Sequence, residues 1–295
     1  MLPRWLKKKI PLGNADHFTE RLVGDLALTT VCDHAKCPNR AECFSRKTAT
    51  FMILGDTCTR SCGFCNVKTG RPEPVDPDEP RRIAEAVRRL GLRHVVLTCV
   101  SRDDLDDGGA EQFRRCLEAL REGGSSLVIE VLPSDFAGNM ESVDRLADAR
   151  PDVYNYNTET VPRLFRQVRG PIPTIERTLA IFRRVAARQP EILLKSGLML
   201  GLGESNGEVL ETLQRLHDAG CRCVTLGQYL RPNPQKLPVV RYVSPEEFDE
   251  LAAEAKRIGF AHVFAGPFVR SSYRAEAAFA TAAAGPDCQP EMPLK

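Results

Sequence analysis

The sequence predicts an α/β fold, a partial (β/α)6 TIM-like barrel with N- and C-terminal extensions. Short apolar runs alternate with amphipathic helical segments from about residue 48 onward. Strand, helix, strand repeated six times implies parallel strands joined by right-handed crossovers. A cysteine-rich loop follows the first strand in place of a glycine-rich dinucleotide motif, which favours a barrel over an open doubly wound sheet.

The expected strands are the six apolar runs of this repeat, with a further short run near the C-terminus. Six units leave a barrel open on one side, and its active groups lie on loops after the carboxyl ends of the strands. The strand candidates are Thr50–Leu54, Val95–Thr98, Leu127–Leu132, Val153–Tyr156, Ile192–Met199 and Val224–Leu226, and the further run is His262–Ala265.

Four of the intervening helices carry signals at their ends. Two show apolar residues at helical spacing and stop before a glycine. Two begin with a serine followed three residues later by glutamate, the spacing of a capping box. The apolar faces are Ile83, Val87 and Leu90 before Gly91, and Phe113, Cys116, Leu117 and Leu120 before Gly123; the capping pairs are Ser205 with Glu208 and Ser244 with Glu247, in helices that close at Gly220 and Gly259.

The repeat divides the chain into three parts. Residues 1–47 are an N-terminal extension, residues 48–265 are the barrel, and residues 266–295 are a C-terminal extension with a flexible tail. The two extensions are positioned to cover the top and the open side of the barrel. The alanine-rich end after Ala277 is expected to fray.

Composition and charge indicate a soluble protein. Lys and Arg number 41 against 39 Asp and Glu, so the formal net charge of +2 gives no general attraction to nucleic acid or anionic membrane. No apolar stretch approaches the ~20 residues of a membrane span, and the N-terminus lacks the apolar core of a secretory signal. We therefore expect a cytoplasmic monomer that binds neither nucleic acid nor membrane.

Eleven cysteines are the unusual feature of the composition. In a reducing cytosol, grouped cysteines are more often metal ligands or catalytic groups than disulfides. Six of them fall close together near the N-terminus, and the other five are scattered and need no function beyond packing. The grouped residues are Cys32, Cys37, Cys43, Cys58, Cys62 and Cys65, and the scattered ones are Cys99, Cys116, Cys221, Cys223 and Cys288.

Cys58, Cys62 and Cys65 stand in GDTCTRSCGFC, with three and then two residues between the thiols. Such a loop can wrap three thiolates around one inorganic centre. Three thiolates leave one iron of a four-iron cubane without a protein ligand, and that iron is open for chemistry. The alternative is a structural zinc knuckle with a remote fourth ligand.

Cys32, Cys37 and Cys43 have four and then five residues between them, which departs from the ferredoxin spacings. A second, auxiliary cluster is the functional interpretation of this group. Buried thiols, or a zinc site unrelated to chemistry, are the alternatives.

The CxxxCxxC loop resembles the radical S-adenosylmethionine superfamily, in which S-adenosylmethionine chelates the open iron and is cleaved to a 5′-deoxyadenosyl radical. With the upstream CxxxxCxxxxxC group, it resembles the lipoyl synthase family. Phe64 occupies the position whose backbone lies near the adenine in the superfamily. The resemblance covers nearly the whole chain, in blocks that follow the family order: PRWLK, GDTCTRSCGFC, VLTCVSRDDLDDGGAEQF, NTETVPRLF, KSGLMLGLGE, LTLGQYLRP and GPFVRSSY.

This resemblance implies a radical S-adenosylmethionine barrel that inserts two sulfur atoms, at C6 and C8 of a protein-bound octanoyl-lysine chain, to give lipoyl-lysine. The sulfides of an auxiliary 4Fe-4S cluster are the implied sulfur source. The implied partners are octanoylated lipoyl carrier domains or H protein, a reduced ferredoxin or flavodoxin type electron donor, and an iron–sulfur carrier protein. The implied ligands are Cys58, Cys62 and Cys65 for the radical-generating 4Fe-4S cluster, and Cys32, Cys37, Cys43 and Ser272 for the auxiliary cluster.

Ser272 has a chemical rationale and a plain alternative. A hard oxygen ligand binds a soft iron–sulfur cluster less firmly than thiolate does, so one iron should be easier to release. The alternative is that Ser271 or Ser272 caps a following helix.

Asn157, Glu159 and Lys195 are the candidate contacts to S-adenosylmethionine. Asn157 and Glu159 follow the fourth strand, on the side where barrel sites lie, and ordinary loop hydrogen bonds are an equal alternative. Lys195 interrupts an apolar strand, and a buried lysine needs a partner. That partner is either the carboxylate of S-adenosylmethionine or an acid such as Glu159 or Glu130.

Two positions depart from the family pattern. Tyr156 stands where the family commonly has histidine in its NHN-type segment, and Lys236 stands where histidine commonly precedes LPV. Neither is expected to touch a cluster ligand, so the departures concern local contacts to cofactor or substrate. Two other functions were weighed: a biotin-synthase-like radical enzyme, and a zinc-ribbon interaction module, which the near-neutral charge and the 6% of aromatic residues disfavour.

Overall fold

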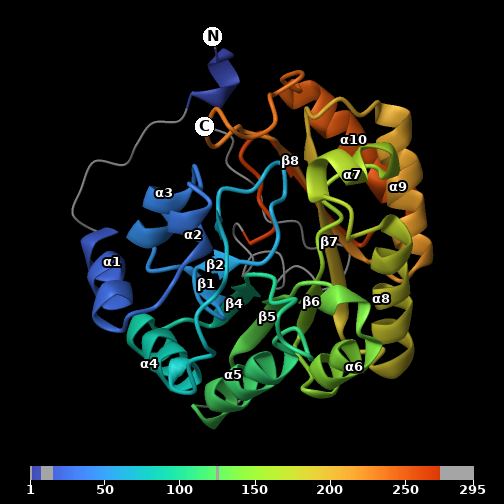
Figure 1. Cartoon of the computed structure of the whole chain (residues 1–295). Helices are drawn as coiled ribbons and strands as arrows, with labels where there is room; N and C mark the ends of the chain where they lie inside the picture. The colour runs from blue at the N-terminus through green and yellow to red at the C-terminus, as the bar shows by residue number, and fades with distance from the viewer. Residues whose placement is uncertain (1, 8–15, 124–125, 273–295) are drawn as a thin grey trace.

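A computed structural model describes residues 2–7, 16–123 and 126–272 (Figure 1). Its main feature is a sheet of seven parallel strands in the order β1-β4-β5-β6-β7-β8-β9, with β1 and β9 at the two edges. The predicted partial barrel is therefore confirmed. The strands are β1 (Thr50–Ile53), β4 (His94–Cys99), β5 (Val128–Leu132), β6 (Val153–Asn155), β7 (Leu193–Leu200), β8 (Cys223–Gln228) and β9 (His262–Gly266).

The further short run near the C-terminus becomes β9. It pairs in parallel with β8, from Cys223 opposite His262 to Gly227 opposite Gly266. The sheet thus continues by one strand beyond the six repeated units. Because all strands run in the same direction, the loops that follow them gather at one edge of the sheet, which is called the carboxyl edge below.

Six helices cover the outer face of the sheet and follow one another around it (Figure 1). Each buries an apolar stripe against the strands, as the helical periodicity of the sequence predicts. Short elements occupy the loops at the carboxyl edge. The helices are α4 (Glu79–Leu90), α5 (Ala110–Glu122), α6 (Met140–Asp148), α8 (Ile175–Arg188), α9 (Asn206–Asp218) and α10 (Pro245–Ile258), and the short elements are β2 (Thr57–Cys58), β3 (Lys68–Thr69), η2 (Phe136–Gly138), η3 (Pro162–Leu164) and α7 (Phe165–Arg169).

The predicted helix ends are present. Gly91, at φ +66°, closes α4 in the left-handed conformation that glycine adopts without strain. The Ser205 hydroxyl and the Glu208 carboxylate form the reciprocal capping box of α9. Ser244 caps α10 by accepting the N–H of Glu247.

The N-terminal extension packs beside β1 (Figure 1). Its helices are α1 (Asp16–Asp25), α2 (Val31–His34) and α3 (Arg40–Ser45), preceded by the single turn η1 (Arg4–Leu6). The N–H of Met52 donates to the oxygen of Thr29 (2.8 Å), and Thr30 forms an antiparallel bridge with Phe51. The extension is therefore attached to the edge strand of the barrel.

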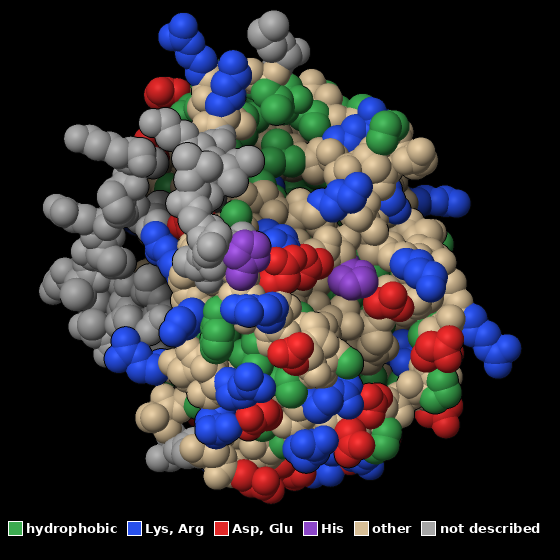
Figure 2. Space-filling model, turned by 90° about the vertical axis from the view of Figure 1, so that its left-hand side faces the viewer, with side chains coloured by type: hydrophobic (Ala, Val, Ile, Leu, Met, Phe, Trp, Pro, Cys, Tyr) green, Lys and Arg blue, Asp and Glu red, His purple; other side chains and the backbone are tan. Residues whose placement is uncertain are grey.

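The scattered cysteines behave largely as predicted. Cys116, Cys221 and Cys223 are buried in the core. The expected frayed tail after Ala277, with Cys288, lies outside the described residues. Within the residues that the structure describes, no helix is long and apolar enough to cross a membrane. On the face shown in Figure 2, basic side chains are interspersed with acidic ones.

Candidate active site

The cluster loop, residues 54–67, leaves β1 at the carboxyl edge of the sheet. Leu54 and Gly55 turn the chain at φ +70° and +91°. The Cys58 sulfur then accepts two backbone N–H bonds, from Arg60 (3.4 Å) and Ser101 (3.3 Å). Backbone hydrogen bonds to sulfur tune the thiolate ligands of iron–sulfur clusters, so this sulfur has the surroundings of such a ligand.

A buried ion network fixes the middle of the cluster loop. Arg60 donates to both oxygens of Asp103 (2.8 and 2.6 Å) and forms an ion pair with Asp135 (2.6 Å). Asp135, fully buried after β5, is also paired with Arg177 of α8 (2.7 Å). Burial alone would raise the pKa of Asp135, but the two arginines outweigh it and the pKa is lowered. The network ties the loop to three neighbouring elements of the barrel.

The second half of the loop rests on α7 and on the segment after β8. The Gly63 N–H donates to Val168 (2.8 Å), and its oxygen accepts from the Leu237 N–H (2.9 Å). A Cβ at Gly63 would lie 2.8 Å from the oxygen of Gln167, so glycine is required there. The Cys62 thiol donates to the oxygen of Arg169 (3.5 Å).

Lys236 corrects one sequence-based expectation. Its ammonium donates to the backbone oxygen of Cys62 (3.2 Å), so this departure from the family pattern does touch a predicted cluster ligand. The contact arises because the segment after β8 folds back over the cluster loop, which sequence spacing alone does not show. Lys236 therefore supports the position of Cys62.

Burial disfavours the thiolate form of Cys62 and Cys65 in the absence of a metal. Burial raises the pKa of Cys65 to about 11 and also raises the pKa of Cys62, while Arg169 opposes the shift at Cys62. The neighbouring thiols contribute to these shifts, Cys58 at both residues and Cys62 at Cys65. Iron binding stabilises the thiolate form, so it would remove this cost.

The donor set fits a cluster better than a single ion. In the described part of the chain, no three His, Cys, Asp or Glu side chains converge to hold one metal ion. In a cubane, each cysteine binds a different iron, so the three thiols need not meet at one point. Cys58, Cys62 and Cys65 are free, partly accessible thiols on one loop.

Asn157 and Glu159 follow β6 at the carboxyl edge, and the charge of Glu159 reaches Cys62 and Cys65. Asn157 donates from its amide to the Ser271 hydroxyl (3.1 Å). Glu159 sits at φ +69° and is held by backbone bonds to Gly197 and Met199 (2.9 Å each). Burial raises the pKa of Glu159, although the guanidinium of Arg169 opposes the shift.

Lys195 is paired with Glu130, one of the two acids that the sequence offered as its partner. Its ammonium lies 2.9 and 3.1 Å from the carboxylate oxygens of Glu130, which also accepts from Asn155 (2.8 Å). In the sheet register Lys195 is opposite Cys223, the first residue of β8, so the pair lies at the amino end of the strands. The interpretation of Lys195 as a contact to S-adenosylmethionine is not supported by this geometry.

The second cysteine group lies on the N-terminal extension. Cys32 is on α2, Cys37 is in the following turn and Cys43 is on α3. The Cys37 N–H donates to the oxygen of Cys32 (3.1 Å). Burial, together with the charges of Cys37 and Cys43, raises the pKa of Cys32 to about 12, which indicates that the three thiols are neighbours.

The segment after β9 reaches this second group. The amide of Asn39 donates to the oxygen of Phe268 (2.8 Å), and the partly buried Arg270 lies within electrostatic reach of both Cys37 and Glu159. Ser272, partly buried, follows two residues later. Ser272 thus belongs to the segment that contacts the N-terminal extension through Phe268.

The remaining candidate, Phe64, is partly buried and packs against the core. Sequence analysis missed Arg60, Asp135 and Arg169. Arg60 carries a usable signal, because a charged residue between two predicted ligands must be neutralised when its loop is buried. Asp135 and Arg169 carry none, since their partners come from other elements.

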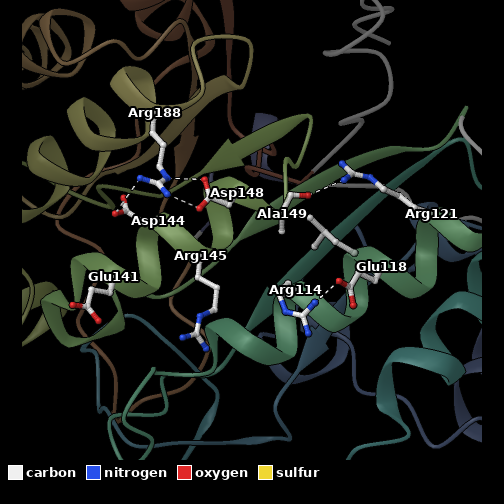
Figure 3. A pocket seen from close by; sticks show the side chains of 10 residues that line it. Arg114, Glu118, Arg121, Glu141, Asp144, Arg145, Asp148, Ala149 and Arg188 are labelled. Atoms are coloured by element: carbon white, nitrogen blue, oxygen red, sulfur yellow. Dashed lines mark hydrogen bonds and ion pairs between the residues drawn. The ribbon is translucent and has the colours of Figure 1, made fainter.

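A surface groove of about 550 Å³ lies away from this site, among α5, α6 and α8 (Figure 3). Its charges are mostly paired with one another, as in the Arg188–Asp148 pair (2.6 Å). It opens on the outer face of the helix layer, whereas all the cysteine loops lie at the carboxyl edge or beside it. The groove therefore has the character of a solvated face between helices.

Comparisons with known proteins show the family to which the chain belongs. The Radical SAM superfamily matches residues 52–216. A lipoyl synthase of Rhodopirellula baltica is 56% identical over 276 residues, which are 93% of this chain and 87% of that protein. A lipoyl synthase of Thermus thermophilus is 49% identical over 278 residues, 94% of this chain and 86% of that protein.

Solved structures support the fold alone, because their identities are low. Streptococcus suis SuiB, bound to its precursor peptide SuiA, matches with a TM-score of 0.57 at 12% identity, over 77% of this chain and 52% of that chain. The FeFe-hydrogenase maturase HydG from Carboxydothermus hydrogenoformans matches with a TM-score of 0.54 at 16% identity, over 79% and 65%.

The fold and the cysteine loop thus define an enzyme of the radical S-adenosylmethionine class, which uses S-adenosylmethionine and a 4Fe-4S cluster. Within that class, the chain belongs to the lipoyl synthase family.

Proposed function

We propose that this enzyme inserts two sulfur atoms, at C6 and C8 of a protein-bound octanoyl-lysine chain, and that a second 4Fe-4S cluster is the sulfur source. The observation that carries the proposal is the occurrence of two separate groups of three cysteine thiols, one on a barrel loop and one on the N-terminal extension. A biotin-synthase-like activity would leave the second group without a role.

The residues present fit two clusters. Cys58, Cys62 and Cys65 hold the first cluster, with Phe64 at the adenine side. The second cluster takes its ligands from the N-terminal extension and the segment after β9: Cys32, Cys37, Cys43 and Ser272. When bound, the first cluster with S-adenosylmethionine supplies radical chemistry, and the second supplies sulfide.

Side chains of the barrel and of its loops fix the positions of the two proposed cluster sites. The Arg60–Asp135 ion pair fixes the cluster loop to the barrel. The Lys236 ammonium donates a hydrogen bond to the backbone oxygen of Cys62 in that loop. The Asn157–Ser271 hydrogen bond joins the loop after β6 to the segment that carries Ser272. The distance between the two cluster sites is therefore set by the barrel.

Further parts of the proposal concern the partners and the location of the enzyme. Its substrates are octanoylated lipoyl carrier domains or H protein. A reduced ferredoxin or flavodoxin type donor supplies electrons, and an iron–sulfur carrier protein rebuilds the second cluster. The enzyme works as a cytoplasmic monomer.

The proposal is tested with two cysteine variants of the anaerobically reconstituted protein and an octanoylated carrier peptide. Cys62→Ala should abolish cleavage of S-adenosylmethionine. Cys37→Ala should still cleave it, and mass spectrometry should then show no peptide that has gained two sulfur atoms. Cys116→Ala, a buried thiol of α5, is the matched control and should retain both activities. Full sulfur insertion by Cys37→Ala would contradict the two-cluster assignment.

A further inference from the structure

Asn66 joins the two cysteine groups directly. It follows Cys65, the last cysteine of the cluster loop. Its side-chain amide donates to the backbone oxygen of His34 (2.8 Å), and His34 stands between Cys32 and Cys37 of the N-terminal extension. One side chain therefore connects a loop of the barrel with the short helix and turn that carry other predicted cluster ligands.

The backbone oxygen of His34 is an acceptor that its own helix does not use. His34 is the last residue of α2, and a helix provides no intrahelical donor for its final carbonyl groups. The Cys37 N–H, which closes the turn after α2, donates to the oxygen of Cys32 instead (3.1 Å). Asn66 thus supplies a donor that the end of α2 needs.

The direction of the Asn66 amide is fixed by a second asparagine. Asn233, in the segment after β8, accepts the Gln235 N–H at its side-chain oxygen (2.9 Å). Its amide nitrogen therefore faces Asn66 and donates to the Asn66 side-chain oxygen (2.7 Å). Because that oxygen is occupied, the amide nitrogen of Asn66 is the group that points to His34. The segment after β8 also bonds to the cluster loop through Lys236, so three segments of the chain meet around Asn66.

The position of the N-terminal extension matters for the chemistry of the proposed function. The substrate carbon has to reach both cluster sites in turn, and a displacement of about 1 Å near a reacting centre can reduce a rate about 100-fold. The Asn39–Phe268 bond attaches the extension to the segment after β9. The Asn66 bond, by contrast, attaches the extension to the cluster loop itself.

We propose that Asn66 is a positioning residue that holds the second cysteine group in place relative to the first, and that Asn233 orients its amide. This role rests on the proposed function, in which both cysteine groups hold clusters. Loss of the Asn66 bond should leave both clusters bound and allow the extension to shift. The enzyme should then still cleave S-adenosylmethionine, but fewer cleavage events should lead to sulfur insertion.

The test measures how cleavage is coupled to sulfur insertion in anaerobically reconstituted protein. Asn66→Ala should bind as much iron as wild type and cleave S-adenosylmethionine within about twofold of the wild-type rate. The number of sulfur atoms gained by an octanoylated peptide, per 5′-deoxyadenosine formed, should fall about fivefold or more. Hydrogen exchange of the same protein should be about threefold to tenfold faster in residues 31–37, the effect of one lost hydrogen bond.

Asn139→Ala is the matched control. It removes the side-chain bond from Asn139 to the oxygen of Asp106 (3.1 Å), together with the N-cap of α6, and it lies outside both cysteine groups. It should destabilise the protein at least as much as Asn66→Ala and leave the coupling at the wild-type value. Equal uncoupling in both variants, or wild-type coupling in Asn66→Ala, would overturn the role of Asn66.

Asn233→Ala covers the case in which Asn66→Ala fails to assemble both clusters. This variant keeps every residue of the cluster loop and leaves the Asn66 amide free to rotate. With full iron content, its coupling should fall about twofold to fivefold. Wild-type coupling in Asn233→Ala would overturn the orienting role on which the proposal depends. Wild-type protein that cleaves S-adenosylmethionine and inserts no sulfur would instead contradict the proposed function itself.

Discussion

The two cysteine groups are held in different ways. The group on the cluster loop is held by the barrel. Cys58 is hydrogen-bonded to the loop after β4, and Cys62 is hydrogen-bonded to the end of α7 and to the segment after β8. The group on the N-terminal extension lies on two short helices outside the sheet. Its links to the rest of the protein include the bond of Asn39 to Phe268 and the bond of Asn66 to the oxygen of His34 (2.8 Å).

This difference fits the two proposed roles. A cluster that acts in every turnover belongs in a framework that does not move, and the buried Arg60–Asp135 pair supplies one. A cluster that gives up its sulfide and is rebuilt belongs where ligands can separate. The extension and the segment with Ser272 are joined by the Asn39–Phe268 bond and, in the proposed function, by the cluster they share, so order at both ends of the chain should depend in part on that cluster.

The largest loss of stability should follow from removing a carboxylate of the ion network that holds the cluster loop. Asp135→Ala leaves the buried charge of Arg60 with one carboxylate fewer and Arg177 without its partner. We expect a loss of about 3–5 kcal/mol in the free energy of unfolding, measured by urea denaturation of the cluster-free chain. Asp144→Ala, which removes the partly buried partner of the exposed Arg184 in the outer groove, is the control and should cost far less. Equal losses in the two variants would show that the network does not anchor the cluster loop.

The same carboxylate predicts a pH dependence. The pKa of Asp135 is lower in the folded chain than the value of about 3.9 in the unfolded chain. Its stabilisation is therefore present above about pH 4 and is lost as the pH falls through the folded-state pKa. The stability difference between wild type and Asp135→Asn should shrink from pH 6 to about pH 3 in urea unfolding experiments. A difference that stays constant over this range would contradict the lowered pKa.

A smaller loss of stability should follow from removing a hydrogen bond that holds the cysteine group of the N-terminal extension. Asn39→Ala removes the bond from the buried Asn39 amide to the oxygen of Phe268, at a cost of up to about 1.5 kcal/mol, the upper range for one intramolecular hydrogen bond. Hydrogen exchange should show faster exchange in residues 266–272, with the cluster loop unchanged. Asn233→Ala, which removes a bond to Asn66, is the control and should leave residues 266–272 protected.

The smallest effect should come from a site that serves neither group. Ser205→Ala removes the N-cap of α9 and should cost about 1 kcal/mol in the free energy of unfolding. The iron content of the reconstituted protein should not change. A loss of iron in this variant would mean that cluster binding depends on the overall stability of the fold. Iron loss would then not distinguish the two cysteine groups, and the proposed difference between them would be contradicted.

The fold could be predicted because its signals are local. The glycine after α4 and the capping box of α9 act within a few residues of the helix ends they define. The cysteine groups could be found for the same reason, since their spacing is read along one short segment.

The side chains around the clusters could not be predicted in the same way. The partner of Lys195 depends on how β5, β6 and β7 align, and a shift by one residue would turn Glu130 to the other face of the sheet. Arg169 becomes important only because α7 packs beside the cluster loop. Contacts of this kind are set by tertiary packing, which the sequence pattern does not carry.

The central claim is that each cysteine group binds its own cluster. It is tested most directly by iron and sulfide analysis of anaerobically reconstituted protein and of two triple variants. Wild type should bind about eight irons per chain, and alanine at Cys58, Cys62 and Cys65, or at Cys32, Cys37 and Cys43, should leave about four in each case. Wild-type protein with about four irons, and no loss when the cysteines of the extension are replaced, would contradict the account.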